Sequence, residues 1–323
     1  MNQVLEQLLN GVLINKDQPY IIYFRYGKNK YQNSHNLEFP IDESTNFRLA
    51  SVTKQFIAYG IISLVNNSLL SFDTSLKDLY PEFPNYFKDI TIQNLLNHTS
   101  GILDYEEFLE KDYQNHQLLD EDIIDFLKNT DHTYFTPGEN YRYSNTAYIL
   151  LGLIISNVSG KSISEYLNEL IFKPLGMYNS TVNIEGKTQI KNRALGHIVE
   201  NGKIVVRDQY WCSATIGDGG IYSSVVDLTK WLEHLKANFN ELKNTMFSKS
   251  VKTGSNTYYG MGMRIVELEN GAIYTHSGST IGTNTLIAFS LDFDFELIFL
   301  TNLGPTETEK IRENLYILVE KKN

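Results

Sequence analysis

The spacing of apolar and polar positions changes twice along the chain, and each change predicts a different kind of element. Residues 20–26 are almost all apolar or aromatic, which predicts a strand, and the turn at 27–30 leads to a second strand near Tyr31. After Ser51 the spacing becomes helical. The apolar residues that share one face of this helix are Phe56, Ile57, Ile61, Leu64 and Val65.

The middle of the chain, residues 66–200, is rich in helix signals. Residues 91–96 have the form of a helix start, and the uncharged run 147–158 predicts a helix that ends before Gly160. Ser162 and Glu165 have the spacing of a capping box that opens another helix, and Pro174 ends it. This stretch therefore predicts a mostly helical region.

Beyond Gly217 the pattern returns to strands. Residues 261–268, 272–276, 283–290 and 296–301 predict an antiparallel series, followed by a closing helix over 306–320. Strands at both ends with helices between them indicate an α+β fold. We expect an antiparallel β-sheet flanked by helices, with an inserted, mostly helical subdomain.

Charge and cysteine content narrow the range of functions. The 323 residues include 28 Lys and Arg against 38 Asp and Glu, a net charge of −10, and no basic run offsets it. Nucleic-acid binding is therefore not expected. The single cysteine, Cys212, excludes an intramolecular disulfide and a multi-cysteine metal site, and is read as a small apolar residue. The seven histidines form no close pair, so we expect no metal and no cofactor.

Two segments bear on localisation. The first residues lack the basic start and apolar run of a signal peptide, so we expect a cytoplasmic protein, or an exported one if a leader has been removed. Residues 55–72 carry no charge, but their apolar part is too short to cross ~30 Å of hydrocarbon. A buried helix is the better interpretation, so no membrane span is expected.

Ser51-Val-Thr-Lys54 is the first candidate for chemistry. A spacing of three places both side chains on one helix face, about 5–6 Å apart at Cβ. Ser51 would sit at the helix N-terminus, where free N–H groups favour negative charge, and burial of Lys54 would let it act as a base. Taken alone, the tetrapeptide fits a capping serine and a surface lysine equally well or better.

Two further motifs lie downstream. In Tyr143-Ser-Asn145 the amide could orient a substrate carbonyl, although Asn145 is also a good N-cap for the helix that follows. In His276-Ser-Gly278-Ser279 the histidine ends a predicted strand, and the glycine would let a ligand approach the backbone closely. A single tyrosine or histidine is more often structural than functional.

The three motifs together resemble the serine β-lactamase and penicillin-binding-protein superfamily, in its class C β-lactamase, esterase and D-aminopeptidase branch. That superfamily carries Ser-x-x-Lys, then Tyr-x-Asn or Ser-x-Asn, then a Lys-Thr-Gly-like strand motif, in this order. Further segments of the same kind surround them: residues 47–54, 95–101, 137–139, 173–177, 217–224 and 259–263. The resemblance covers nearly the whole chain and implies a β-lactamase/transpeptidase-like fold.

The resemblance also implies a domain organisation. Residues 1–65 and 201–323 would form a discontinuous sheet subdomain, and residues 66–200 a mostly helical one. Together they would make one catalytic domain with the active site between them. The implied substrate is a small molecule or short peptide, and the sequence indicates nothing about oligomeric state.

Roles follow from the same resemblance. Ser51 would be the nucleophile, with Lys54 and Tyr143 as its base, and the backbone N–H groups of Ser51 and Ser279 would hold the oxyanion. Asn145, His276, Gly278 and Ser279 would bind substrate. Positive charge from Lys54, aided by His276, would let Tyr143 act as a base.

The third motif carries His276 where efficient β-lactamases carry lysine. Histidine there is common among the esterases and D-aminopeptidase-like enzymes of the branch, and its charge would be lost as pH rises. We therefore expect a serine hydrolase of esters or small amides and peptides. The alternatives are a DD-peptidase or weak β-lactamase, and a penicillin-binding sensor or scaffold without turnover.

Overall fold

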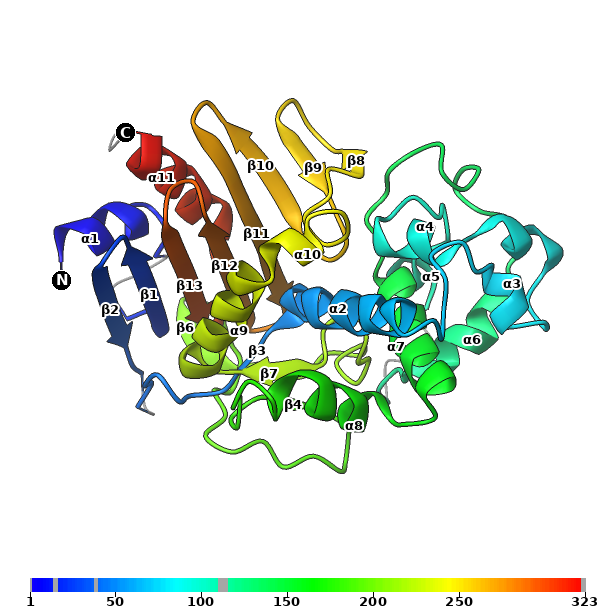
Figure 1. The fold of residues 1–323 in the computed structure, drawn as a ribbon. Coiled ribbons are helices and arrows are strands. Elements are labelled where there is room, and N and C mark those ends of the chain that lie inside the picture. Colours follow the sequence, from blue (N-terminus) through cyan, green and yellow to red (C-terminus); the bar gives the residue numbers. More distant parts are fainter. Residues whose placement is uncertain (1, 14–16, 38–39, 110–115, 321–323) are drawn as a thin grey trace.

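The computed structural model describes residues 2–13, 17–37, 40–109 and 116–320. Its centre is an antiparallel sheet with the strand order β2-β1-β13-β12-β11-β10-β9-β8 (Figure 1). The bounds are β1 (Tyr20–Tyr26), β2 (Asn29–His35), β8 (Val251–Lys252), β9 (Thr257–Tyr259), β10 (Arg264–Leu268), β11 (Gly271–Thr280), β12 (Thr283–Ser290) and β13 (Phe295–Thr301). The N-terminal hairpin thus joins strands from the end of the chain, as the discontinuous sheet requires.

Both faces of this sheet are covered, which explains why strand β1 is apolar at nearly every position. Ile22 and Phe24 face a core shared with α1 (Gln3–Leu9) and α11 (Thr308–Glu320). Ile21 and Tyr23 point the other way, into the core that contains α2 (Thr53–Asn66) and α9 (Val225–Ala237). Figure 1 shows α1 and α11 together on one side, away from α9 and α2.

A mostly helical region lies beside the sheet (Figure 1). Its helices are α3 (Leu76–Leu79), η2 (Asn85–Asp89), α4 (Ile92–Leu96), α5 (Tyr105–Phe108), α6 (Asp120–Lys128), α7 (Asn145–Ser159), α8 (Ile163–Leu167) and the π-helix η3 (Asn168–Phe172). Helix α7 packs against α2, and its central positions are buried, which explains its uncharged sequence. It ends at Gly160, whose φ of 69° is the left-handed conformation that a helix C-terminus favours.

Two small sheets and one short helix complete the fold. One sheet joins β3 (Phe47–Arg48), β7 (Ile221–Ser223) and β4 (Thr181–Val182). The other joins β14 (Leu303–Gly304), β5 (His197–Glu200) and β6 (Lys203–Val206). The short helix is α10 (Phe239–Leu242).

Most sequence expectations about elements are confirmed. The fold is α+β, the capping box of Ser162 and Glu165 is formed, and α2 is a buried helix. Two strand bounds were wrong. Strand β10 begins at Arg264 rather than at residue 261. Strand β11 continues through His276 to Thr280, which pairs with Thr283 across the hairpin. The ladder uses backbone groups alone, so Gly278 does not interrupt it.

Within the described residues, no single helix has both the length and the apolar character needed to cross a membrane. Helix α7 and the helical segment 163–172 meet that test only as a pair bent by 84°.

Candidate active site

Ser51 lies in η1 (Ala50–Val52), a 3₁₀ turn that leads directly into helix α2. The preceding residue, Ala50, has a φ of 47°, an uncommon and strained value for a residue with a Cβ. The turn is held from two sides. Leu49 N donates to Ile221 O at 2.8 Å, and Thr285 Oγ1 on β12 donates to Leu49 O at 2.8 Å.

Strand β11 runs so close to this turn that only glycine fits at position 278. A Cβ on Gly278 would overlap the Leu49 carbonyl oxygen and lie 3.0 Å from Ser51 N. The glycine therefore lets the backbone of β11 pack against the turn that carries Ser51. The sequence had suggested only that it lets a ligand approach the backbone.

We expect Gly278→Ala to disrupt this contact. Overpacking of this kind costs about 1–3 kcal/mol, and the displaced turn should lower kcat at least about tenfold. Urea unfolding and ester hydrolysis measure the two effects. Gly254→Ala is the control, since its Cβ would meet only ordinary contacts with Thr257. Equal free energies of unfolding and equal kcat values for the two variants would contradict the steric argument.

Lys54 is fully buried and its ammonium nitrogen is surrounded by oxygen atoms. Nζ lies 3.2 Å from Ser51 Oγ, 2.8 Å from Asn145 Oδ1 and 2.9 Å from Asp218 O. The expectation that Ser51 and Lys54 share one helix face is met. The alternative of a surface lysine is wrong.

Asn145 is the first residue of α7, and the cap of that helix is its neighbour. Ser144 Oγ accepts from Ala147 N at 3.1 Å, which makes Ser144 the N-cap. The alternative that Asn145 caps the helix is therefore wrong, and its side chain is free to bind Lys54. Its backbone N donates to Asp104 Oδ2 at 2.6 Å, which fixes the start of the helix over the site.

Tyr143 joins the cluster from the segment before α7. Its hydroxyl is buried and has no hydrogen-bond partner among the described residues. Two cations lie near its ring: Lys54 Nζ at 5.0 Å from the centroid and the Arg264 guanidinium carbon at 5.8 Å. Arg264, on β10, was not singled out from the sequence, because a lone arginine in a strand carries no signal.

His276 points into the same cluster but is not a cation. Its Nδ1 lies 2.7 Å from Ser277 O, which can only accept, so Nδ1 carries the proton. Nε2, 3.0 Å from the Tyr259 hydroxyl, then accepts from it. Burial, followed by the charges of Arg264 and Lys54, lowers the pKa of His276 well below its usual value. The sequence had left the charge of His276 open, and this lowered pKa means that His276 adds no positive charge near neutral pH.

His98 is a second buried histidine that sequence reasoning did not assign. Its ring lies 4.3 Å from that of Tyr143, between centroids, and its Nδ1 accepts from Ser144 N at 3.1 Å. Burial lowers its pKa well below the usual range, so it too is neutral. It supports the Tyr143–Ser144 backbone, and its signal was present in the segment 95–101 that carried part of the resemblance.

A cavity of about 50 Å³ lies beside Ser51 and has Asn145 and Ser279 in its wall. It adjoins a wider hollow of about 510 Å³, and four residues line both: Glu106, Cys212, Ser279 and Thr280. Burial raises the pKa of the Cys212 thiol to about 12, so Cys212 stays protonated, in line with an inert cysteine. Of the predicted site residues, Ser51, Asn145 and Ser279 line the cavity beside Ser51. The others lie behind them: Lys54 contacts Ser51 and Asn145, Gly278 packs against the Ser51 turn, and the Tyr143 ring lies near Lys54 and His276.

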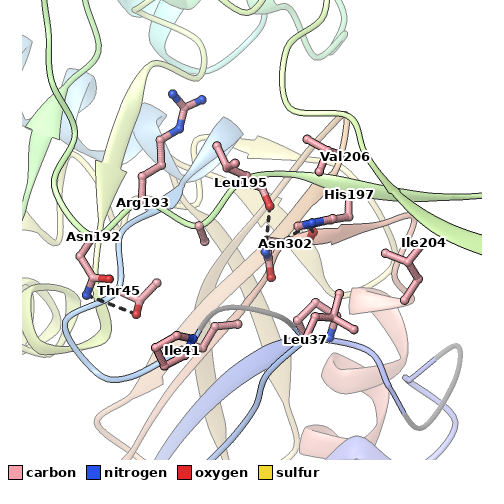
Figure 2. A pocket seen from close by; sticks show the side chains of 13 residues that line it. Leu37, Ile41, Thr45, Asn192, Arg193, Leu195, His197, Ile204, Val206 and Asn302 are labelled. Atoms are coloured by element: carbon pink, nitrogen blue, oxygen red, sulfur yellow. Dashed lines mark hydrogen bonds between the residues drawn. The ribbon is translucent and has the colours of Figure 1, made fainter.

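Another cavity of about 300 Å³ lies at the β5–β6 hairpin (Figure 2). Its wall includes Leu195, His197, Val206 and Asn302. None of the motif residues lines it, so its size alone does not make it the reaction site.

A family model described as Beta-lactamase matches residues 15–321. The chain belongs to the β-lactamase family. Penicillin-binding protein 4* of Bacillus subtilis (strain 168) is 32% identical to it over 284 residues, which cover 81% of this chain and 62% of that protein. Protein flp of Staphylococcus aureus (strain MW2) is 27% identical over 319 residues, covering 94% and 61%. The chain thus spans less than two thirds of the length of these curated relatives.

Solved structures agree with the β-lactamase family assignment. A penicillin-binding protein from Bacillus halodurans has a TM-score of 0.83 at 26% identity, covering 98% of this chain and 99% of that one. An octameric penicillin-binding protein homologue from Pyrococcus abyssi has a TM-score of 0.83 at 25% identity, covering 98% and 76%. D-amino acid amidase from Ochrobactrum anthropi SV3 shares the fold, with a TM-score of 0.81 at 21% identity and 99% coverage of both chains. The resemblance inferred from the motifs is confirmed.

Proposed function

We propose that this chain is a serine hydrolase that acts through an acyl-enzyme on esters or on small amides and peptides. The observation that carries the proposal is the buried Lys54 Nζ, 3.2 Å from Ser51 Oγ. Its other two neighbours, Asn145 Oδ1 and the Asp218 carbonyl, can only accept hydrogen bonds. The third position on Nζ therefore faces Ser51, where a neutral amine accepts the hydroxyl proton and an ammonium stabilises the alkoxide.

The reaction then has two halves. Ser51 Oγ attacks the substrate carbonyl carbon while its proton passes to Lys54 or Tyr143, and the oxyanion is held by the N–H groups of Ser51 and Ser279. Removal of one such donor typically costs about 3–4 kcal/mol. The leaving group departs with the proton, and water, deprotonated at the Tyr143 site, attacks the ester of Ser51 to release the acid.

Tyr143→Phe tests the proton-transfer role with little structural cost. The hydroxyl has no partner to lose among the described residues, so the free energy of unfolding should change by less than about 1 kcal/mol. Loss of a general base should lower kcat for p-nitrophenyl butyrate by about 10²–10⁴-fold.

Tyr141→Phe is the matched control for this variant. Its hydroxyl is also buried, and burial raises its pKa to about 12 although the nearby Arg264 acts in the opposite direction. A kcat within about threefold of wild type is expected for it. Comparable losses in both variants would show that the hydroxyls act through packing instead.

Covalent labelling tests the proposed function directly. A fluorophosphonate should add one adduct, detected by intact mass, at Ser51. Fast hydrolysis of p-nitrophenyl butyrate with little nitrocefin turnover should follow, because the neutral His276 offers no cation to a penicillin carboxylate. Absence of any adduct would overturn the proposal. A penicillin adduct that persists for hours would instead indicate a penicillin-binding sensor or a slow DD-peptidase.

A further inference from the structure

The cavity at the β5–β6 hairpin is separate from the reaction site (Figure 2). Its volume of about 300 Å³ is that of a pocket for a small ligand. Among the described residues, it shares no wall residue with either hollow beside Ser51. The serine chemistry therefore leaves this space unused.

Apolar side chains from several segments form much of the wall of this cavity. Ile41 is buried, Ile204 is half-buried, and Leu195 and Val206 are exposed by 39% and 57%. The other apolar residues in the wall are Pro19, Leu37, Pro40 and Ala194. Such a wall favours a ligand with an apolar body, because binding removes these side chains from water.

One buried acceptor in the wall lacks a donor. Asn302 is only 6% exposed, and its Nδ2 donates to Leu195 O at 2.8 Å and lies 3.3 Å from His197 Nδ1. Since a carbonyl can only accept, the contact with Leu195 fixes which end of the amide is the oxygen. Oδ1 is buried without a partner among the described residues, and Figure 2 shows it on the side of Ile41. A ligand that meets this oxygen must therefore donate a hydrogen bond to it.

Arg193 is the charged residue among the described residues of the wall, and its charge is already paired. It forms an ion pair with Asp208, and its guanidinium carbon lies 5.0 Å from the centroid of the Tyr222 ring. Its Nε has no partner among the described residues, but Figure 2 shows the side chain extending away from Asn302. A charged ligand would lose hydration here without gaining an opposite charge, so a neutral ligand fits better.

We propose that this cavity binds a neutral, apolar small molecule that carries one N–H or O–H donor. The donor meets Asn302 Oδ1, and the apolar body packs against Ile41, Leu195 and Ile204. A ligand of the same shape without the donor leaves Asn302 Oδ1 desolvated and unpaired, so it should bind more weakly. The site is distinct from that of the serine mechanism, and its ligand is not the substrate of Ser51.

Indole and benzofuran test the hydrogen bond, because they have nearly the same shape and only indole has an N–H. Ligand-observed NMR titrations of the wild-type protein should give a Kd for indole of about 0.1–1 mM, as expected for a ligand of this size. Benzofuran should bind at least about fivefold more weakly. In a crystal structure of the complex, indole should lie against Ile41 with its nitrogen within hydrogen-bond distance of Asn302 Oδ1.

Two variants separate the role of the acceptor from that of the space. Asn302→Leu removes Oδ1 at similar volume and should bring the ratio of the two Kd values to about one. Ile204→Trp extends a half-buried side chain of the wall and should weaken binding of both ligands at least about fivefold. Val205→Trp is the matched control, at the next residue of β6 and outside the wall, and should leave both Kd values within about twofold.

Three binding results would overturn this ligand site. They are the absence of saturable indole binding up to about 10 mM, equal affinity of the wild type for indole and benzofuran, and equal affinity of Ile204→Trp and Val205→Trp for indole. Crystal density for indole only beside Ser51 would overturn it as well. Thermal unfolding checks that each variant is folded. If Asn302→Leu does not fold, the ligand pair and the two β6 variants still decide.

Discussion

Replacing Ser51 by alanine is expected to lower kcat for p-nitrophenyl butyrate by about 10⁴-fold or more and to abolish the fluorophosphonate adduct. Among the described residues, no other hydroxyl forms a hydrogen bond with Lys54 Nζ, so no second nucleophile is in position to replace Ser51. The oxyanion donors are backbone groups and survive the change, which leaves a residual rate above that of water.

The fold should tolerate this substitution. Among the described residues, Ser51 Oγ has one side-chain partner, Lys54, and loss of this contact should change the free energy of unfolding by about 1 kcal/mol. Thermal unfolding and intact mass check this on one sample. Ser255→Ala, at an exposed loop position, is the control and should keep full activity. Retention of the adduct in Ser51→Ala would place the reactive group elsewhere.

The sheet and the large helices could be predicted from the sequence because buried positions carry apolar residues at the spacing of a strand or a helix. The run at 20–26 is apolar on both faces because each face of β1 meets a helical layer. The capping box of Ser162 and Glu165 is equally local. The end of β11 was predicted too early because Gly278 was taken as a break in the strand. Strand pairing depends on backbone hydrogen bonds, and glycine can make these as other residues do.

Site residues could be predicted only where they lie close together in the sequence or belong to motifs shared with the β-lactamase family. Ser51 and Lys54 are one turn apart, so helical geometry alone relates them. Whether Ser144 or Asn145 caps α7 is locally ambiguous, since both are good caps, and Lys54, 91 positions away from Asn145, decides it.

The charge states of the buried site residues could not be predicted from the sequence. Burial, followed by the charges of Arg264 and Lys54, lowers the pKa of His276, whereas its hydrogen bond to the Ser277 carbonyl acts in the opposite direction. Glu106 and Asp218 are 112 positions apart and meet through the Tyr105 hydroxyl. Nothing in a linear pattern marks such a pair, because isolated acidic residues are common on any surface.

Lys54→Met is the second decisive variant, because it separates charge from packing. Methionine keeps most of the side-chain volume, so the core around α2 should remain filled. The Asn145 amide oxygen and the Asp218 carbonyl lose a donor, which costs about 1–3 kcal/mol each. Removal of a buried ammonium offsets part of that cost. The net loss of unfolding free energy should therefore be smaller than the sum of the two lost hydrogen bonds. In contrast, kcat should fall by about 10³–10⁴-fold.

The kinetics of this variant distinguish the two possible roles of Lys54. With p-nitrophenyl butyrate, the pre-steady-state burst of p-nitrophenol reports acylation and the steady state reports deacylation. If Lys54 acts on the Ser51 hydroxyl, the burst rate should fall with kcat. Lys54→Arg keeps the charge but cannot give up its proton, so activity rescued by arginine would show that charge alone is needed. Lys128→Met, at a solvent-facing position beside Asp125, is the matched control. A Lys54→Met enzyme within tenfold of wild type would contradict the assignment, because the contact between Nζ and Ser51 Oγ is the observation on which the serine mechanism depends.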